Sequence, residues 1–454
     1  MRRIARVKIE GLFGYVNHDV EFSRDTTTII SGPNGIGKTH FLRLVHALLT
    51  LDLGTLASVD FKKIEIHFID KYAMKVEQKW QAGDISVFRI SERNPQARNF
   101  KGVDVPYSKD AEEVRELPPH LVRLPDGSVY DMRMDRPLSP DFAQRRYGIS
   151  PVPSAASHFG NSWLGDFFKS ADAILVDTQR LDISPNYRGG AQTSASSPRQ
   201  GPVITRIRQY IDQVAAQLSD ARRASLNESL KADQTFAARV LKKARTTINE
   251  KDLKERYQRI ADQHAELHAS GMSVRPVDVE FPREKTTPTE RRILNVFLDD
   301  WERKLLPLLP IHEKLKALRR IVESKFIGKE LLLNSRGYVR FRSTVSGKPL
   351  AVNSLSSGEQ HLLALFTMLL FAADEGGLIL IDEPEISMHA AWKHTFLDDV
   401  AEVARLSNLQ IVLATHSSAI INGQWELVQE IAMPQLSQSD VQHAEEFDDL
   451  ESEV

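Results

Sequence analysis

Apolar and polar residues alternate at the start of the chain, and the spacing then becomes helical. Ile4, Val7 and Ile9 fit a strand, and residues 26–32 form a β-branched run that ends in glycine. Residues 39–50 carry apolar side chains three and four positions apart without a helix breaker. The N-terminal region therefore predicts strands followed by a glycine-rich loop and a helix.

Short alternating runs continue between residues 64 and 134, separated by turn pairs such as Asp126-Gly127. This pattern favours an antiparallel sheet layer. Residues 171–181 (ADAILVDTQRL) then predict a buried strand that leads into a polar loop.

The middle of the chain has a different pattern. Residues 182–202 are rich in Ser, Gly and Pro and predict a mobile loop or linker. Two stretches, 204–221 and 253–267, then carry apolar residues at alternating steps of three and four. The repeat lasts only about three heptads, so it fits either two short antiparallel coiled-coil-like helices forming an arm or two amphipathic helices on a domain surface. Basic residues interspersed with acids favour a solvated face over a nucleic-acid track; they are Arg206, Arg208, Arg222, Arg223, Lys242, Lys243 and Arg245.

A capping box opens the next predicted helix. Thr287-Pro288-Thr289-Glu290 places a capping threonine three residues before a glutamate, with proline at the first helical position. A further helix near 311–325, strands and a turn over 330–347, and an α/β pattern from Leu355 should follow. Residues 434–454 end in an acidic stretch that we expect to be disordered; docking on a basic partner is the alternative.

Composition narrows the classes of function. The 454 residues suit two or three structural units, and 41% hydrophobic with 26% charged residues is ordinary for a soluble globular protein. A formal net charge of -2 gives no overall attraction to polyanions, and the absence of cysteine excludes disulfides, thiolate nucleophiles and zinc–cysteine sites. No apolar run approaches the roughly 20 residues of a membrane helix, and no signal-peptide pattern is present, so we expect a cytoplasmic protein.

The glycine-rich loop carries the first candidate chemistry. It fits the phosphate-loop pattern GxxxxGK[ST] between a predicted strand and helix, through Gly32, Pro33, Asn34, Gly35, Ile36, Gly37, Lys38 and Thr39. Backbone N–H groups at the helix N-terminus would bind the β-phosphate, Lys38 would reach the β- and γ-phosphates, and the Thr39 hydroxyl would bind Mg²⁺. A chance glycine-rich turn is the alternative. We include His40, the next residue, in the predicted ATP site.

Two further strands end in polar residues that should meet this loop at one sheet edge. Residues 378–381 are an apolar strand followed by Asp382 and Glu383. Asp382 is expected to bind Mg²⁺ and Glu383 to polarise the attacking water, although adjacent acids also occur as simple helix N-terminal charges. A third strand, 410–414, precedes His416, which would sense or position the γ-phosphate unless it is a structural or solvated histidine. Lys38, Glu383 and His416 are therefore the candidate catalytic residues.

The stretch LSSGEQ at 355–360 resembles the signature motif of ABC-type ATPases. With the phosphate loop, IDEPE and ATHS it makes four motifs in that family's order. The resemblance implies an α/β fold: an ABC-type P-loop ATPase head, with a mixed sheet, flanking helices and an antiparallel β layer, and an inserted helical, coiled-coil-like arm. It also implies ATP bound between two heads, in a head-to-head dimer or a larger ring, with the γ-phosphate of the partner's ATP contacted by Ser356, Ser357, Gly358 and Glu359.

The pattern along the chain, together with this resemblance, predicts the domain boundaries. We expect the N-terminal part of the head with the antiparallel layer at 1–181, a flexible linker at 182–202, the helical arm at 203–328, the C-terminal part of the head at 329–433 and the acidic tail at 434–454.

The long insertion resembles the arm-bearing branch that includes RecF and SMC proteins. LSSGEQHLLAL, LILIDEPEISMHAAWKHTFL and IVLATHSSAII are similar to OLD-like proteins and to the standalone ATPase subunits of anti-phage systems such as PARIS, Septu and certain retrons. The stretch VDTQRL corresponds to the family's glutamine loop, which implies Gln179 as a metal or nucleotide contact and Arg180 as a neighbour of the phosphates. Phe13 and Tyr15 are candidates to stack on adenine, and each is also compatible with a plain core or surface role.

OLD proteins carry a C-terminal metal-dependent nuclease domain, whereas this chain shows no acidic cluster in a folded context after its last predicted element. The resemblance therefore implies a separate effector nuclease, TOPRIM-like or HNH-like, controlled by this ATPase, with a phage protein or DNA as the trigger and no membrane partner. Two other functions stay open. One is a RecF- or SMC-like DNA-binding ATPase in repair, and the other is a scaffold with vestigial nucleotide binding.

Overall fold

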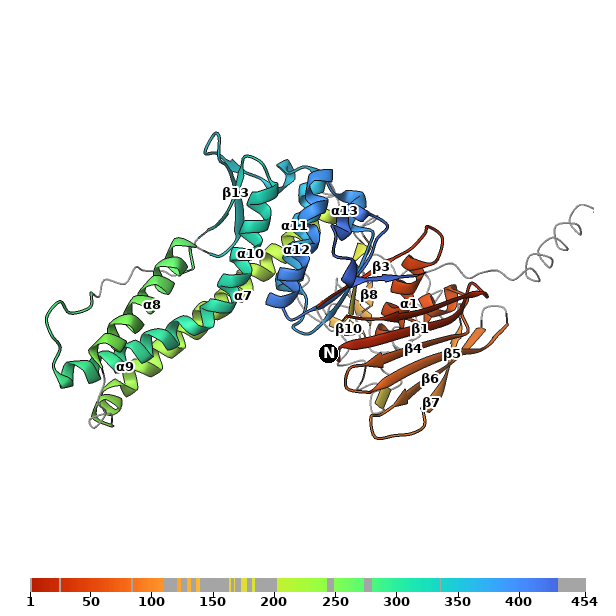
Figure 1. Ribbon diagram of the computed structural model, residues 1–454, viewed down its shortest axis with the longest axis horizontal. Helices are drawn as coiled ribbons and strands as arrows, with labels where there is room; N and C mark the ends of the chain where they lie inside the picture. The colour runs from red at the N-terminus through yellow and green to blue at the C-terminus, as the bar shows by residue number, and fades with distance from the viewer. Residues whose placement is uncertain are drawn as a thin grey trace, which may run out of the picture.

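A head and a helical arm that projects from it make up the molecule (Figure 1). The computed structural model describes residues 2–23, 26–82, 85–108, 121–123, 129–131, 136–138, 163–164, 167, 173–177, 182–183, 202–242, 249–272, 280–334 and 336–431. The predicted linker lies almost wholly outside these residues, and the acidic tail lies entirely outside them. The domain boundaries therefore stay predictions.

An antiparallel sheet forms the outer layer of the head. Its strand order is β2-β1-β4-β5-β6-β7, where the strands are β1 (Ile4–Leu12), β2 (Val16–Glu21), β4 (Lys63–Phe68), β5 (Ala73–Ala82), β6 (Ile85–Arg93) and β7 (Lys101–Ser108). Burial alternates along β2 and β4, as expected for strands with one face on a core and the other in water. A smaller antiparallel sheet has the order β10-β9-β8, from β8 (Leu121–Arg123), β9 (Val129–Asp131) and β10 (Arg136–Leu138).

The second large sheet lies at the centre of the head, and five of its strands run parallel. Its order is β12-β11-β16-β17-β3-β18, with only β12 antiparallel; the bounds are β3 (Thr27–Ser31), β11 (Ala173–Asp177), β12 (Asp182–Ile183), β16 (Leu378–Asp382), β17 (Gln410–Ala414) and β18 (Val428–Glu430). Every residue of β16 and β17 is buried, because both faces of the sheet are covered. The predicted buried strands are confirmed.

Alternate residues of these strands enter two different hydrophobic cores. In β16, Leu378 and Leu380 join the core shared with α1 (Lys38–Thr50) and the antiparallel sheet, while Ile379 and Ile381 join the core on the opposite face. The opposite core contains α10 (Leu309–Lys325), α11 (Ser357–Thr367) and α12 (Ala390–Leu406). The head is therefore layered as antiparallel sheet, α1, parallel sheet and a helical layer.

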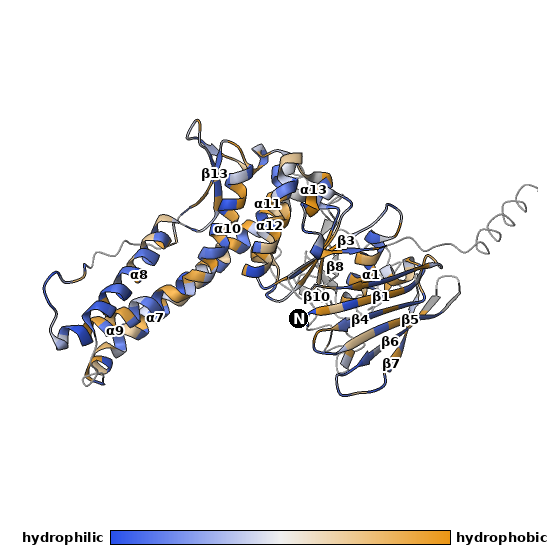
Figure 2. Ribbon diagram, in the orientation of Figure 1, coloured by the Kyte–Doolittle hydropathy of each residue, from blue (hydrophilic) through white to orange (hydrophobic). Residues whose placement is uncertain are grey.

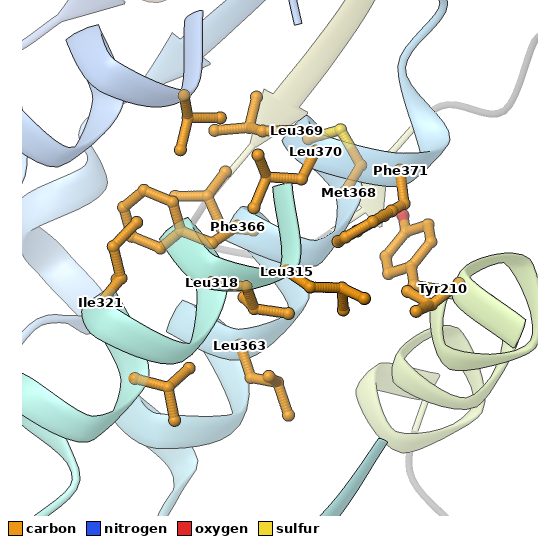
Figure 3. Close-up of a cluster of buried hydrophobic side chains, with 14 of the residues drawn as sticks. Tyr210, Leu315, Leu318, Ile321, Leu363, Phe366, Met368, Leu369, Leu370 and Phe371 are labelled. Carbon is orange, nitrogen blue, oxygen red and sulfur yellow. The ribbon is translucent and has the colours of Figure 1, made fainter. Parts of the chain in front are cut away.

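Long apolar side chains from several elements form the hydrophobic core of the helical layer. Figure 3 shows Tyr210 beside Phe371, and Leu315 and Leu318 of α10 among the aromatic and apolar side chains of residues 363–371. These belong to α11 and to the π-helical segment Met368–Ala372 that continues it. The remaining short elements of the described chain are α2 (Leu53–Ser58), α13 (Ser418–Ile421), β13 (Lys329–Leu333), β14 (Val339–Ser343), β15 (Pro349–Leu350), and 3-10 segments at Leu306–Leu308, Val352–Ser354, Pro384–Ser387 and Trp425–Leu427.

Three helices build the arm: α7 (Pro202–Lys242), α8 (Glu250–Ala269) and α9 (Pro288–Leu305). The first is a single helix of 41 residues, so the expectation of two short helices is wrong in length. Its apolar spacing weakens beyond the predicted stretch, but no glycine or proline interrupts the helix, which therefore continues. In addition, α9 packs against both α7 and α8, so the arm is a three-helix group rather than a pair.

Capped and charged contacts stabilise helices in both the arm and the head. The predicted capping box is confirmed at α9, where the Thr287 side chain and Glu290 satisfy each other's backbone N–H groups. In the helical layer of the head, Lys325 of α10 and Asp399 of α12 form an ion pair in which each side chain is 4% exposed. Within the described residues no helix is long and apolar enough to cross a membrane.

The observed architecture confirms the expected fold class, an α/β P-loop ATPase head with a mixed sheet, an antiparallel layer and inserted helices.

Candidate functional site

The phosphate loop lies between β3 and α1 and is shaped by its glycines. Gly35 and Gly37 have φ angles of +84° and +93°, values that L side chains rarely adopt. A Cβ at Gly37 would also lie 2.8 Å from Leu12 Cδ2, and one at Gly32 would lie 2.6 Å from the Ile431 carbonyl oxygen. The loop therefore depends on glycine for its backbone path, which leaves backbone N–H groups at the start of α1 for an anion.

Lys38 folds into this loop. Its Nζ donates hydrogen bonds to the carbonyl oxygens of Gly32, at 2.8 Å, and Pro33, at 2.9 Å, and the residue is only 6% exposed. Burying an ammonium group costs free energy unless its N–H donors are hydrogen-bonded, and the two carbonyl oxygens accept these hydrogen bonds. The cation is thus held beside the backbone donors of the loop, where a phosphate group would meet both.

The carboxyl ends of β3, β16 and β17 bring the other motifs to the same edge. Asp382 ends β16 in register with Ala414 of β17, and Ala414 is in register with Ile30 of β3. Asp382 is 8% exposed. Parallel strands present their carboxyl ends together, and ligands of open α/β sheets bind outside that edge. The structure therefore gathers Lys38, Asp382 and the residues after Ala414, as the sequence predicted.

Glu383 stands directly after β16 in a left-handed backbone conformation. Its φ is +43°, uncommon for a residue with a side chain, and its N–H donates to the Ala414 carbonyl oxygen at 2.8 Å. Such conformations persist where surrounding contacts enforce them, and they concentrate at functional sites. The backbone therefore changes direction at Glu383, the residue predicted to polarise the attacking water.

His416 lies between two carboxylates. Its Nδ1 is 3.6 Å from Oε1 of Glu383 and 3.4 Å from Oε1 of Glu385, and the histidine side chain is 47% exposed. Glu385 itself is 4% exposed and accepts a hydrogen bond of 2.6 Å from the Thr415 hydroxyl. The sequence motifs alone do not mark Glu385 and Thr415 as site residues. Glu385 is the second glutamate of IDEPE, but the motif does not reveal that it is buried against a residue 30 positions away.

The signature segment begins α11 with a capping box. The Ser356 hydroxyl accepts from the Glu359 N–H at 3.3 Å, and a Glu359 carboxylate oxygen accepts from the Ser356 N–H at 2.8 Å. Lys329 of β13 also donates to Glu359. Burial raises the pKa of Glu359, but the hydrogen bonds from Lys329 and Ser356 outweigh it and hold the pKa below its ordinary value. Glu359 thus supports the helix start, and its contact with a partner's nucleotide stays a prediction.

Ser357 is exposed and Gly358 is half-buried, directly at this helix N-terminus. The side chains of α11 pack on one face of the parallel sheet, while α1 packs on the other. The phosphate loop and the signature are therefore attached to opposite sides of the central sheet of one chain.

Beside the phosphate loop, the rings of His40 and Phe13 meet edge to face, with centroids 5.0 Å apart. Burial, and secondarily the charge of Arg43, lower the pKa of His40 below 6.5, so its ring is mostly neutral at neutral pH. Tyr15 is 57% exposed. Neither aromatic is assigned to adenine by these contacts. Gln179 and Arg180 lie outside the described residues.

The donor chemistry of this edge fits a nucleotide with Mg²⁺. The described residues contain no group of three or more His, Cys, Asp or Glu side chains arranged to hold a metal by themselves. Mg²⁺ in nucleotide enzymes usually takes one or two protein oxygens and completes its shell with phosphates and water. Asp382 and the Thr39 hydroxyl are donors of that kind.

Residues 189–422 match the model of a family described as "AAA domain, putative AbiEii toxin, Type IV TA system". No curated protein matches the chain.

Three solved SMC head domains are similar to the chain. The first, from Pyrococcus furiosus, has an extended coiled coil and is bound to the C-terminal domain of ScpA; it shares 14% identity, with 98% of this chain and 99% of that chain covered and a TM-score of 0.35. The head domain with a coiled coil and joint from Pyrococcus yayanosii shares 13% identity, with 99% and 100% covered and a TM-score of 0.35. The head domain from Thermotoga maritima shares 10% identity, with 96% of each chain covered and a TM-score of 0.31.

Proposed function

Because this chain belongs to the family described as AAA domain, putative AbiEii toxin, type IV TA system, we propose that it binds and hydrolyses ATP with Mg²⁺ as the regulatory subunit of a two-component bacterial defence system. In this proposal the heads associate around ATP, respond to a phage protein or DNA, and control a separate effector nuclease. The observation that carries the proposal is the convergence of Lys38, Asp382, Glu383 and His416 at the carboxyl edge of one parallel sheet.

Each of these residues has a chemical role in ATP hydrolysis. Lys38 and the loop N–H groups bind the phosphates, and Asp382 with Thr39 holds Mg²⁺, which neutralises phosphate charge when bound. Glu383 accepts the proton of the attacking water, because its carboxylate lies just past the strand end at the nucleotide edge. His416, beside Glu383, positions the γ-phosphate or the attacking water.

The opposite placement of α1 and α11 supports a role for the signature across two copies. Since the two helices pack on different faces of the parallel sheet, Ser357 and the phosphate loop of one chain are separated by that sheet. A second copy brings its exposed helix N-terminus to the phosphate without crossing the sheet. ATP binding would then drive association by mass action.

The charges of the arm favour a regulatory subunit over a DNA clamp. Arg239 and Arg256 form ion pairs with acids of α9, and Arg222 donates to the Gly271 carbonyl oxygen at 3.0 Å. Arginines that are already paired offer little attraction to phosphates, whereas DNA binding relies on accessible cations.

The test combines turnover with partner capture. Purified Glu383→Gln protein should bind ATP with near-wild-type affinity and hydrolyse it at least about 100-fold more slowly, because the proton acceptor is lost. Glu426→Gln, the same change at an exposed site, is the control and should match the wild type. Normal turnover by Glu383→Gln would refute the assigned role.

Tagged Glu383→Gln protein, isolated with ATP and Mg²⁺ from cells carrying the native locus, should recover a stoichiometric nuclease. Recovery of DNA alone, with affinity that falls steeply as salt rises, would instead establish the RecF- or SMC-like alternative. Ser357→Arg should leave ATP binding intact and abolish ATP-dependent association in light scattering. Unchanged association would remove the signature from the interface.

A further inference from the structure

A buried carboxylate lies beneath the candidate catalytic residues. Glu385 belongs to the 3-10 segment Pro384–Ser387 that follows β16. Its Oε1 accepts from the Thr415 hydroxyl at 2.6 Å and from the backbone N–H of His416 at 3.3 Å. One oxygen atom therefore joins the turn that carries Glu383 to the loop that carries His416.

Strand pairing does not require this carboxylate. Asp382 and Ala414 are already in register, and the Glu383 N–H already bonds to the Ala414 carbonyl oxygen. Burying a carboxylate costs free energy, which an apolar side chain of similar size would avoid. Moreover, Oε2 of Glu385 is buried and accepts no hydrogen bond from any residue that the structure describes. A partly satisfied buried charge calls for an explanation other than packing.

The position of the imidazole supplies that explanation. Nδ1 of His416 faces both Glu385 and Glu383, at ion-pair distances of 3.4 and 3.6 Å. A negative charge beside Nδ1 favours the tautomer with its proton on that nitrogen, as orienting carboxylates do for histidines in metal sites and catalytic triads. Nε2 is then the ring nitrogen left for substrate. The Thr415 hydroxyl, which also accepts from the Ser417 N–H at 3.0 Å, fixes the carboxylate in the loop.

We propose that Glu385 is a positioning residue for ATP hydrolysis: held by Thr415, it sets the orientation and tautomer of His416 beside Glu383. This proposal rests on the ATPase activity proposed above and deepens it. In this proposal the contact between Glu385 and the loop of Thr415 and His416 affects the rate of hydrolysis. Glu385 itself acts only by orienting His416.

Two variants separate positioning from a structural role. In Glu385→Gln an amide oxygen still accepts from Thr415 and the His416 N–H, but the charge that orients the ring is gone. We expect kcat to fall about 10- to 100-fold, the range found for partners that orient a histidine, while KM and ATP affinity change less than about twofold. Thr415→Val removes the hydroxyl donor and should lower kcat about 10-fold, and Thr415→Ser should restore it.

The measurements are kcat and KM of the full chain, ATP affinity by calorimetry and thermal unfolding, with Glu426→Gln as the matched control. A selective loss of kcat in Glu385→Gln, with Thr415→Ser active and Thr415→Val impaired, supports the proposal. Wild-type kcat in Glu385→Gln overturns it, and so does a parallel loss of melting temperature, ATP affinity and kcat in both Glu385→Gln and Thr415→Val. If the wild type itself binds but does not hydrolyse ATP, the proposed function fails, and this inference fails with it.

Discussion

Charged side chains are buried at the edge of the parallel sheet, whereas those of the arm stay partly exposed. At the sheet edge Lys38, Asp382 and Glu385 are at most 8% exposed, and the adjoining Glu383 adopts a left-handed backbone conformation. In the arm, charged side chains remain partly accessible and pair between helices, as Arg256 does with Asp299 at 2.8 Å. Charges in the arm thus accompany helix packing, whereas charges at the edge are buried at a cost that the proposed ATP hydrolysis would explain.

Hydrophobic patterning shows the same contrast. Both faces of β16 and β17 are buried, while the arm helices show orange and blue residues mixed along their lengths (Figure 2). On α8 only a stripe is buried, and it includes Leu253, Ile260 and Leu267. The arm also buries a polar pair, since the Trp301 indole donates to His264 Nδ1 at 2.8 Å. The helices of the arm therefore bury one face each and also use specific polar contacts, whereas the parallel sheet is buried on both faces.

The largest expected effect is at the sheet edge and concerns activity rather than stability. Lys38→Met should reduce ATP turnover by about 10³-fold, because a phosphate-binding cation is lost. The same change removes a buried charge, so the melting temperature should stay within a few degrees of the wild type. Steady-state ATPase assays and calorimetric unfolding measure both. Retained turnover would contradict the assignment of the loop.

The next effect concerns the helical layer of the head, where α10 packs against α12. Asp399→Ala leaves the Lys325 ammonium buried with the Thr395 hydroxyl but no carboxylate, and it also removes the pair between Arg320 and Asp399. Together these losses should lower the free energy of unfolding by about 3–5 kcal/mol. Glu402, which pairs with the half-exposed Arg320, is the control, and Glu402→Ala should cost less than about 1 kcal/mol. Chemical denaturation compares the two. Equal costs would show that burial does not distinguish these pairs.

Within the arm the expected effect is smaller. Arg256→Ala removes ion pairs to Asp299 and Glu302 across the α8–α9 contact, where the arginine side chain is 25% exposed. We expect a loss of about 1 kcal/mol that shrinks at high salt, with unchanged ATP turnover. Denaturation at two salt concentrations tests this. A large loss of turnover would mean that the arm controls hydrolysis through this contact.

The smallest effect is a pH dependence at the signature helix. The pKa of Glu359 is depressed in the folded protein, so its carboxylate contributes stability above the ordinary pKa of 4.5. That contribution is lost as the pH falls through the folded pKa. Glu359→Gln should therefore be less stable than the wild type at about pH 7, and the difference should shrink in acid. A constant difference across the acid range, measured by thermal unfolding, would contradict the Lys329 and Ser356 contacts.

The amino-acid sequence alone determined the local features of this protein. Alternation and helical spacing predicted most strands of the head, α1, α10 and the capping box of α9, because these patterns act over a few residues. They did not predict the short strands β12 and β18. The phosphate loop was recognisable because its glycines and Lys38 stand at fixed spacing between strand and helix.

Tertiary structure decided the contacts between distant segments. The order β11-β16-β17-β3, which is not the order of the chain, places Glu385 against Thr415, and the return from the arm places Lys329 against Glu359. It also decided that α9 lies between α7 and α8. A residue pattern shows which side chains must be buried, but which distant partner buries them depends on how the sheets and helices pack, and that is settled by the whole chain at once.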